Sequence, residues 1–175
     1  MKRMTMTLLA AALMLLPMPR TLGQQGAKQS FGFNAASIKG FPTGEAFLTG
    51  GGAYDPNPES GFLKAGGAFR CLADIEQLPL KGCKAGQGIR WDTVQLLSSA
   101  PFKCTGALGE PLKTAVTDGD TVVILADFYR QGDGVDESFT AKMFVSAVDE
   151  APDLPGVQNV WIQGVGCADA IANFN

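Results

Sequence analysis

The segments Thr121-Val-Val-Ile-Leu-Ala-Asp-Phe-Tyr-Arg130 and Ser138-Phe-Thr-Ala-Lys-Met-Phe-Val-Ser-Ala-Val148 decide the fold, because both are rich in the β-branched and aromatic residues that favour strands. Residues 131–137, which separate them, have the Gly/Asp composition of a turn. We therefore predict an antiparallel hairpin. Both alternating faces of its first strand are apolar, which predicts a central strand covered on both sides. The second strand alternates apolar and polar residues and is predicted to be half-buried.

The rest of the chain repeats this pattern of short strands and turns, without long helical periodicity. A second hairpin is predicted from Glu45–Tyr54 and Phe62–Cys71, which the proline-containing turn 55–61 joins. Further strands are predicted at Gly88–Leu97, Pro101–Thr105, Leu112–Thr117 and Val157–Cys167, and a short helical turn at Ala168–Phe174. About eight short antiparallel strands predict an all-β domain, either a single β-barrel or a β-sandwich, and the pattern does not separate the two.

Glycine clusters interrupt both strands of the second hairpin. They are Gly50, Gly51 and Gly52 in the first strand, and Gly66 and Gly67 in the second. Glycine weakens a strand, so such clusters mark a bulge, a barrel corner, or the close approach of an aromatic ring, a backbone or a ligand. We favour the structural interpretations over a ligand site.

The N-terminus has the pattern of a cleavable secretory signal peptide. Lys2 and Arg3 precede the apolar run Leu8–Leu16. This run is shorter than the roughly 20 residues of a membrane-spanning helix, so no transmembrane anchor is expected. The small residue Gly23 suits the position before a cleavage site, and we predict that residues 1–23 are removed.

Cleavage would leave 152 of the 175 residues, enough for one core. We interpret residues 24–43, which are rich in Gln, Ser, Gly and Lys, as an N-terminal arm, and residues 44–175 as one β domain. Cleavage removes three basic and no acidic residues, and so changes the formal net charge from −3 to −6. Nucleic-acid binding depends on clustered Lys and Arg, so this acidic chain is not expected to bind nucleic acid.

The four cysteines predict disulfides, because an even number in an exported chain favours pairing. The chain has no histidine and no CxxC pair, which excludes the usual zinc and imidazole-type copper sites, and no cofactor is expected. Of the three possible pairings we favour Cys71 with Cys83 and Cys104 with Cys167. The expected localisation is secreted, either extracellular or periplasmic.

The turn at 131–137 belongs to the most polar constellation of the chain, residues 127–137. Asp133, Asp136 and Glu137 are weak candidates for calcium ligands, since calcium takes six to eight oxygen atoms. Their spacing does not match an EF-hand loop. A solvated hairpin turn is therefore the favoured interpretation.

Carboxylates are the main option for catalysis in a chain without histidine. Asp127 has apolar neighbours on both sides and is the best candidate for a partly buried acid. A glycosidase-type reaction needs a second carboxylate. The possible partners are Glu45, Asp92 and Glu137. Arg130 completes this weak catalytic set, although an ion pair of Asp127 with Arg130 or Arg90 is the favoured alternative.

Aromatic residues with a polar atom are the candidates for ligand binding, because they suit partly wet surfaces. Trp91, Tyr129 and Trp161 are the main candidates, and Tyr54 is a further one. Exported β domains often stack such rings on sugars or hold apolar molecules in a barrel mouth. Packing in the core or at its rim is the favoured interpretation of the two tryptophans.

We expect a secreted β domain that binds a small molecule, a glycan or a protein partner without catalysing a reaction. One alternative is a carboxylate-dependent hydrolase or isomerase, for which carboxylates should converge in a cleft. The other is a structural interaction module of the cell surface, for which an exposed apolar patch is expected.

Overall fold

The computed structural model describes residues 28–40, 43–130 and 137–175. These ranges contain eleven strands and one short 3-10 helix, η1. The elements are β1 Gln29–Gly40, β2 Glu45–Tyr54, η1 Pro58–Ser60, β3 Leu63–Ala73, β4 Arg90–Leu97, β5 Ser99–Phe102, β6 Lys113–Val116, β7 Thr121–Arg130, β8 Glu137–Ser146, β9 Val160–Ile162, β10 Gly166–Ala168 and β11 Ile171–Phe174.

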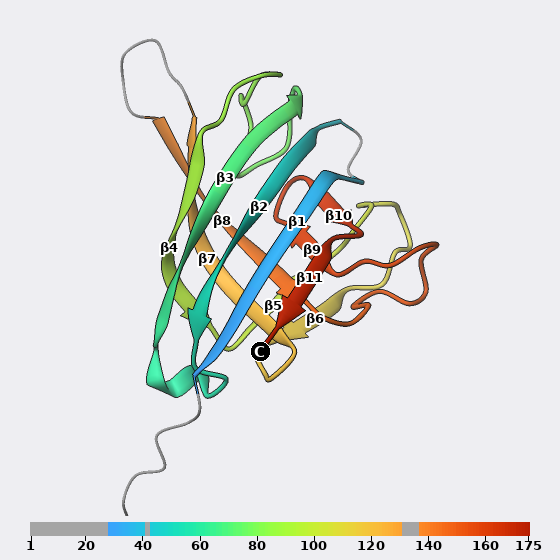
Figure 1. Ribbon diagram of the computed structural model, residues 1–175. Coiled ribbons are helices and arrows are strands. Elements are labelled where there is room, and N and C mark those ends of the chain that lie inside the picture. The colour runs from blue at the N-terminus through green and yellow to red at the C-terminus, as the bar shows by residue number, and fades with distance from the viewer. Residues whose placement is uncertain (1–27, 41–42, 131–136) are drawn as a thin grey trace, which may run out of the picture.

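Eight of these strands form a closed antiparallel barrel in the order β1-β2-β3-β4-β7-β8-β9-β10, and β10 pairs back with β1 (Figure 1). β11 is an additional strand that pairs with the other half of β1, so β10 and β11 share one edge of that strand. β5 and β6 form a separate two-stranded sheet. The structure confirms the all-β fold and selects the barrel over the sandwich.

Large side chains fill the barrel interior. Alternate residues of the strands point inward and are almost completely buried, among them Leu48, Phe69, Trp91, Phe128 and Met143. At one end, the segment between β3 and β4 adds two fully buried side chains, Ile75 and Leu80. At the other end, three rings pack together, those of Phe31, Tyr54 and Phe174.

Trp91 accounts for one glycine in each cluster, Gly50 of β2 and Gly67 of β3. The indole Nε1 reaches past β3 and donates a 3.0 Å hydrogen bond to the carbonyl of Thr49 in β2. A Cβ atom at Gly50 would lie 2.6 Å from the indole Cζ2, and a Cβ atom at Gly67 would lie 2.6 Å from Nε1. These two glycines therefore make room for an aromatic ring, as one of the structural interpretations predicted, whereas a Cβ atom at Gly51 or Gly52 would meet the backbone of a neighbouring strand.

A second hydrophobic cluster lies on the outer side of the barrel wall. Val123 of β7, Phe144 of β8 and Trp161 of β9 belong to it. They are covered by Phe102 of β5 and Ala115 of β6. The β5–β6 sheet explains why the first part of β7, residues 121–124, is buried on both faces, as its sequence predicted. Further along β7, the outward residues Leu125, Asp127 and Tyr129 are half-buried.

Three segments differ from the predictions. Residues 29–40, interpreted as part of an N-terminal arm, form β1, because Phe31 and Phe33 alternate with more exposed residues and bury their rings in the core. The tail predicted as a helical turn forms β11. The strand predicted at 157–167 is two strands, because Gly164, with a φ of 85°, turns the chain between β9 and β10.

Both predicted disulfides are present, Cys71–Cys83 and Cys104–Cys167. The first closes the segment between β3 and β4. The second joins the segment after β5 to β10 at the closure of the barrel, where Cys167 is the cross-strand partner of Lys39. Within the three described ranges, no helix is long and apolar enough to cross a membrane. The predicted signal peptide lies outside these ranges.

Candidate functional site

The three predicted ligand-binding rings do not come together. Trp91 is fully buried inside the barrel, and Trp161 lies in the outer cluster, 3% exposed, with its Nε1 donating to the carbonyl of Lys103. Neither tryptophan offers a ring face to the surface. Tyr129 is half-buried on the outer wall, and the guanidinium of Arg90 lies 4.7 Å above its ring.

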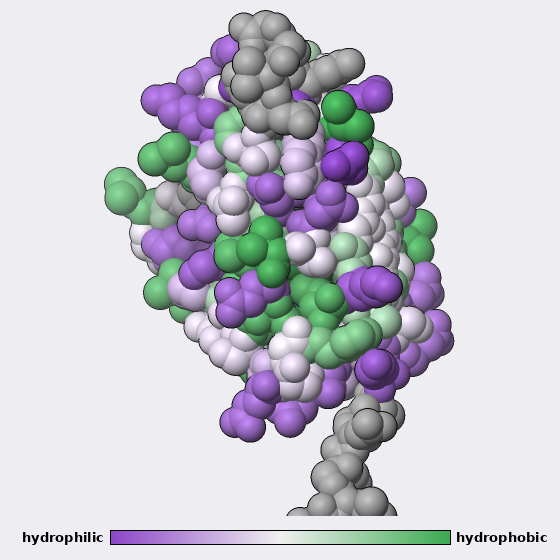
Figure 2. Space-filling view, turned by 90° about the vertical axis from the view of Figure 1, so that its left-hand side faces the viewer, coloured by the Kyte–Doolittle hydropathy of each residue, from purple (hydrophilic) through white to green (hydrophobic). Residues whose placement is uncertain are grey.

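The structure brings Asp127 opposite one of its proposed partners. Asp127 of β7 and Asp92 of β4 are cross-strand neighbours on the outer wall. Their strand neighbours Trp91, Ala126 and Phe128 point into the core. Arg90 Nε lies 3.1 Å from Asp92 Oδ2, so a cation partly offsets the repulsion of these like charges. Figure 2 shows the barrel from the side of β4, where hydrophobic residues gather in the middle of the face with hydrophilic residues around them.

The catalytic candidate Arg130 has structural contacts. Arg130 Nη1 donates a 2.6 Å hydrogen bond to the carbonyl of Gly82, and its guanidinium lies 4.9 Å from the Phe139 ring centre. Glu137 is the cross-strand partner of Arg130 at the first position of β8. Arg130 therefore ties the segment between β3 and β4 to the β7–β8 hairpin.

The calcium prediction falls largely outside the described residues, since Asp133 and Asp136 lie in the undescribed range 131–136. Within the described residues, no three His, Cys, Asp or Glu side chains are grouped so that they could hold a metal ion.

A groove of about 360 Å³ lies on the outer wall over β1, β2 and β3, and we call it the outer groove. Its lining residues are Ala36, Phe47, Ala68, Phe69, Arg70, Leu72 and Ile89. Leu72 is 41% exposed and Ile89 is 53% exposed, which is high for large apolar side chains. The volume lies within the range typical of small-molecule sites, from about 300 Å³ upward.

Two irregularities of the strands produce this hollow. The pairing of β1 with β2 shifts register between Ala35 and Ile38, which places Ala36 in a bulge. The pairing of β2 with β3 shifts between Glu45 and Ala46, directly before Phe47. Bulges bend the strand and increase its twist, and they are common beside functional sites.

Ile89 forms a wall of the groove because the chain returns along β3 before β4 begins. Cys71 N–H donates to the Gln87 carbonyl at 2.7 Å, and Phe69 N–H donates to the Ile89 carbonyl at 3.3 Å. Gly88 permits this approach, since its φ is 114° and a Cβ atom there would lie 2.7 Å from Arg70 Cα. The Cys71–Cys83 disulfide closes the same segment, so it supports this wall.

A second groove, of about 330 Å³, lies near η1. Half of its lining residues are polar, and the full set is Pro58, Glu59, Gln95, Leu96, Leu97 and Ser98. Neither groove is lined by Asp92 or Asp127. The outer groove is the more apolar of the two and is the candidate binding site.

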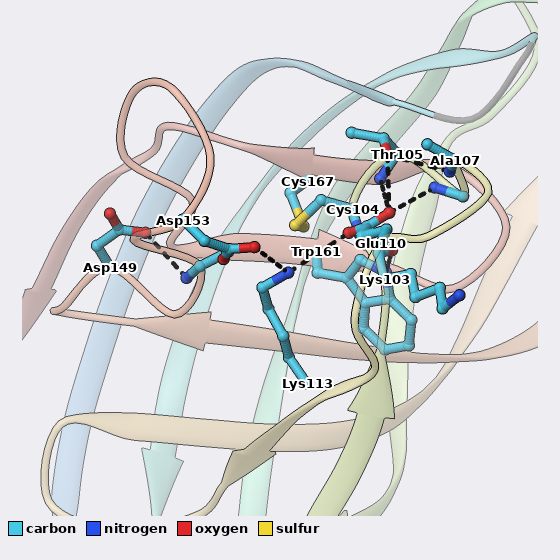
Figure 3. A network of polar contacts seen from close by, with 12 residues as sticks. Lys103, Cys104, Thr105, Ala107, Glu110, Lys113, Asp149, Asp153, Trp161 and Cys167 are labelled. Atoms are coloured by element: carbon cyan, nitrogen blue, oxygen red, sulfur yellow. Dashed lines mark hydrogen bonds and ion pairs between the residues drawn. A yellow bond between two sulfur atoms is a disulfide. The ribbon is translucent and has the colours of Figure 1, made fainter.

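Glu110 is the centre of a buried polar network beside the Cys104–Cys167 disulfide (Figure 3). Its carboxylate accepts hydrogen bonds of 2.6 to 2.9 Å from the backbone N–H groups of Cys104, Thr105 and Gly106, and one of 2.7 Å from the Thr105 hydroxyl. Lys113 Nζ lies 3.7 Å from this carboxylate and 3.1 Å from that of Asp153.

The hydrogen bonds decide the charge state of Glu110. Burial alone would raise the pKa of its carboxyl, but the bonds from the Thr105 hydroxyl and the three backbone N–H groups outweigh burial and hold the pKa below its usual value. Both carboxylate oxygens are occupied by donors. Glu110 therefore orders the segment after β5 and has the environment of a structural carboxylate.

The residues of the outer groove were not predicted from the sequence. Phe47, Arg70 and Leu72 lie on the outward face of a correctly predicted hairpin, and large apolar residues on an outward face are the signal that was available. The bulges and the returning segment that hollow this face arise from tertiary pairing, which no local pattern indicates.

The fold and the groove together define a disulfide-linked, eight-stranded β-barrel with a packed interior and an apolar groove on its outer wall. No protein-family model matches the chain, and neither a curated protein nor a solved structure matches it at a significant level.

Proposed function

We propose that this protein is exported and acts as a non-catalytic binding protein, with the outer groove as its ligand site. The observation that carries the proposal is the contrast between the two sides of the barrel wall. Inside, the barrel is filled by buried side chains such as Trp91 and Phe128. Outside, Leu72 and Ile89 expose large apolar surfaces in a hollow of about 360 Å³. Exposed apolar surface in a hollow is typical of binding sites.

Export is supported by two independent features. Residues 1–23 have the order of charges, apolar residues and small residues that export machinery recognises. All four cysteines are paired in two disulfides, which persist in oxidising compartments.

The groove is tested by titrating the purified protein with Nile red, an uncharged dye whose fluorescence rises in apolar surroundings. Leu72→Ser and Ile89→Ser are each expected to weaken dye binding about threefold to tenfold, because each removes apolar area worth about 1 kcal/mol in contact with the dye. Val94→Ser is the matched control, since Val94 is 56% exposed on β4 and lies outside the groove. Equal loss in all three variants, or no binding to the unmodified protein, would contradict the proposal.

Export is tested by fusing residues 1–23 to an alkaline phosphatase that lacks its own leader and becomes active only where its disulfides form. Activity is expected for the fusion and should be lost when Leu13→Arg interrupts the apolar run. An active Leu13→Arg fusion, or an inactive unmodified one, would count against export.

A further inference from the structure

We infer that the ligand of the outer groove is a small amphipathic carboxylate, with its alkyl chain on the apolar walls and its carboxylate against Arg70. This inference rests on the proposed function of the groove and adds the chemical class of the ligand.

Arg70 is built into the apolar hollow. It lies on β3 between Ala68 and Leu72 on the outward face, and its cross-strand partner on β2 is Phe47. Phe47 is half-buried, and Leu72 and Arg70 are exposed. A cation thus lies directly beside the apolar side chains that line the groove, and a ligand that covers these side chains also reaches the guanidinium.

The charge of Arg70 has no counter-ion in the described part of the chain. No carboxylate there lies within ion-pair distance of its guanidinium, and its side chain makes no hydrogen bond with the described residues. Two other cations near this end of the barrel are paired: Lys84 with Asp74 at 2.9 Å, and Arg90 with Asp92 at 3.1 Å. Arg70 is therefore available to an anion.

A carboxylate suits this cation better than other charged groups do. The guanidinium presents its N–H donors as a planar fork that matches the two oxygens of a carboxylate. The groove is lined by a single cation, which complements a single negative charge. Its volume of about 360 Å³ is near the lower end for small-molecule sites and favours a short alkyl chain.

The experiment compares octanoate, octan-1-ol and octylamine, which share one alkyl chain and differ in the charge of the head group. Binding is followed by chemical-shift changes of backbone amides around the groove. We expect octanoate to bind about twofold to fivefold more tightly than octan-1-ol, because its carboxylate forms a charge-assisted pair with an exposed arginine. Octylamine should bind most weakly, because its ammonium is repelled by Arg70.

Arg70→Gln is expected to abolish the preference for octanoate over octan-1-ol. Arg90→Gln is the matched control, because that arginine is paired with Asp92 and lies outside the groove, and it should keep the preference. Equal binding of octanoate and octan-1-ol, or a preference that survives Arg70→Gln, would overturn the carboxylate inference while the groove remains a binding site. Failure of all three compounds to bind would instead contradict the proposed function.

Discussion

The indole of Trp91 crosses β3 inside the barrel and donates its hydrogen bond to the backbone carbonyl of Thr49, two strands away, at 3.0 Å. Only glycine at position 67 permits this path, because a Cβ atom there would lie 1.9 Å from the Thr49 carbonyl oxygen and 2.6 Å from the indole nitrogen. One strand thus lacks a side chain so that its neighbour can place a large one in the core.

Gly67→Ala is expected to destabilise the protein by at least about 1–3 kcal/mol, the usual cost of overpacking a core, because the contacted carbonyl is backbone and cannot rotate away. Gly32→Ala is the matched control in β1, since the nearest atom to a Cβ there is 3.9 Å away. That variant should be neutral or slightly more stable. Urea unfolding followed by tryptophan fluorescence measures both, and equal stabilities would show that the indole does not require Gly67.

The two disulfides should differ in their effect on the free energy of unfolding. Cys104 and Cys167 are separated by 63 residues, and Cys71 and Cys83 by 12. Loop-closure entropy predicts losses of about 4 and about 3 kcal/mol when each pair is replaced by serines. Only the Cys71→Ser/Cys83→Ser variant should also weaken Nile red binding, because that disulfide supports the wall formed by Ile89. Thermal unfolding and dye titration together check this, and weaker binding in the other variant alone would contradict it.

Glu110 should make stability depend on acid pH. Its pKa in the folded protein lies below that of the unfolded chain, so its contribution is fully present above the unfolded value of about 4.3 and is lost as pH falls through the folded pKa. Glu110→Gln should cost about 1–3 kcal/mol at neutral pH, and the difference from the unmodified protein should shrink below about pH 4. Glu59→Gln, at an exposed position, is the control and should have little effect at either pH. If the difference in free energy of unfolding between Glu110→Gln and the unmodified protein does not change with pH, the charged form of Glu110 does not have this role.

Tyr54 should make stability depend on alkaline pH. Burial, followed by the charges of Asp118 and Asp120, raises the pKa of its phenol, whose hydroxyl donates a 2.8 Å hydrogen bond to the Asp118 carbonyl. In the unfolded chain tyrosine ionises near about pH 10, so the contribution of Tyr54 is present below that pH and is lost as pH rises above it. Tyr54→Phe should lower the free energy of unfolding by about 1 kcal/mol near neutral pH. The variant should also lose less stability than the unmodified protein as the pH becomes alkaline.

The other tyrosine, Tyr129, serves as the control for this measurement. Tyr129 lies on the outer wall, and Tyr129→Phe should lose as much stability at alkaline pH as the unmodified protein does. Urea unfolding at neutral and alkaline pH measures all three proteins. If Tyr54→Phe loses as much stability at alkaline pH as the unmodified protein, the buried phenol is not the source of that loss.

Local pattern was sufficient for the strands with strong alternation and for the covalent links. The ranges 45–54 and 121–130 were predicted with the bounds that β2 and β7 have, and both disulfide pairings were correct. The strand at which the barrel closes was harder to predict. β1 has the alternating Phe31 and Phe33, but its Gln, Ser and Gly residues resemble an arm, and only pairing with β2 on one edge and with β10 and β11 on the other makes it a strand.

The candidate site was beyond the reach of local pattern. Rings with a polar atom were candidates for a wet surface, with core or rim packing favoured for the two tryptophans. Trp91 and Trp161 satisfy their N–H groups with the carbonyls of Thr49 and Lys103 and are buried, as the favoured interpretation predicted. The groove instead depends on where Ile89 returns beside Arg70. That proximity is created by tertiary pairing of the returning segment with β3.

The shared edge of β1 sets the order of events during biosynthesis. Residues 166–174, which complete that edge, leave the ribosome more than a hundred residues after β1. One edge of β1 therefore stays unpaired until late in synthesis. Pairing between segments so far apart in the sequence is the kind of contact that slows folding. If the chain is exported, β1 passes through the translocation channel before β10 and β11, and the barrel can close only on the far side of the membrane.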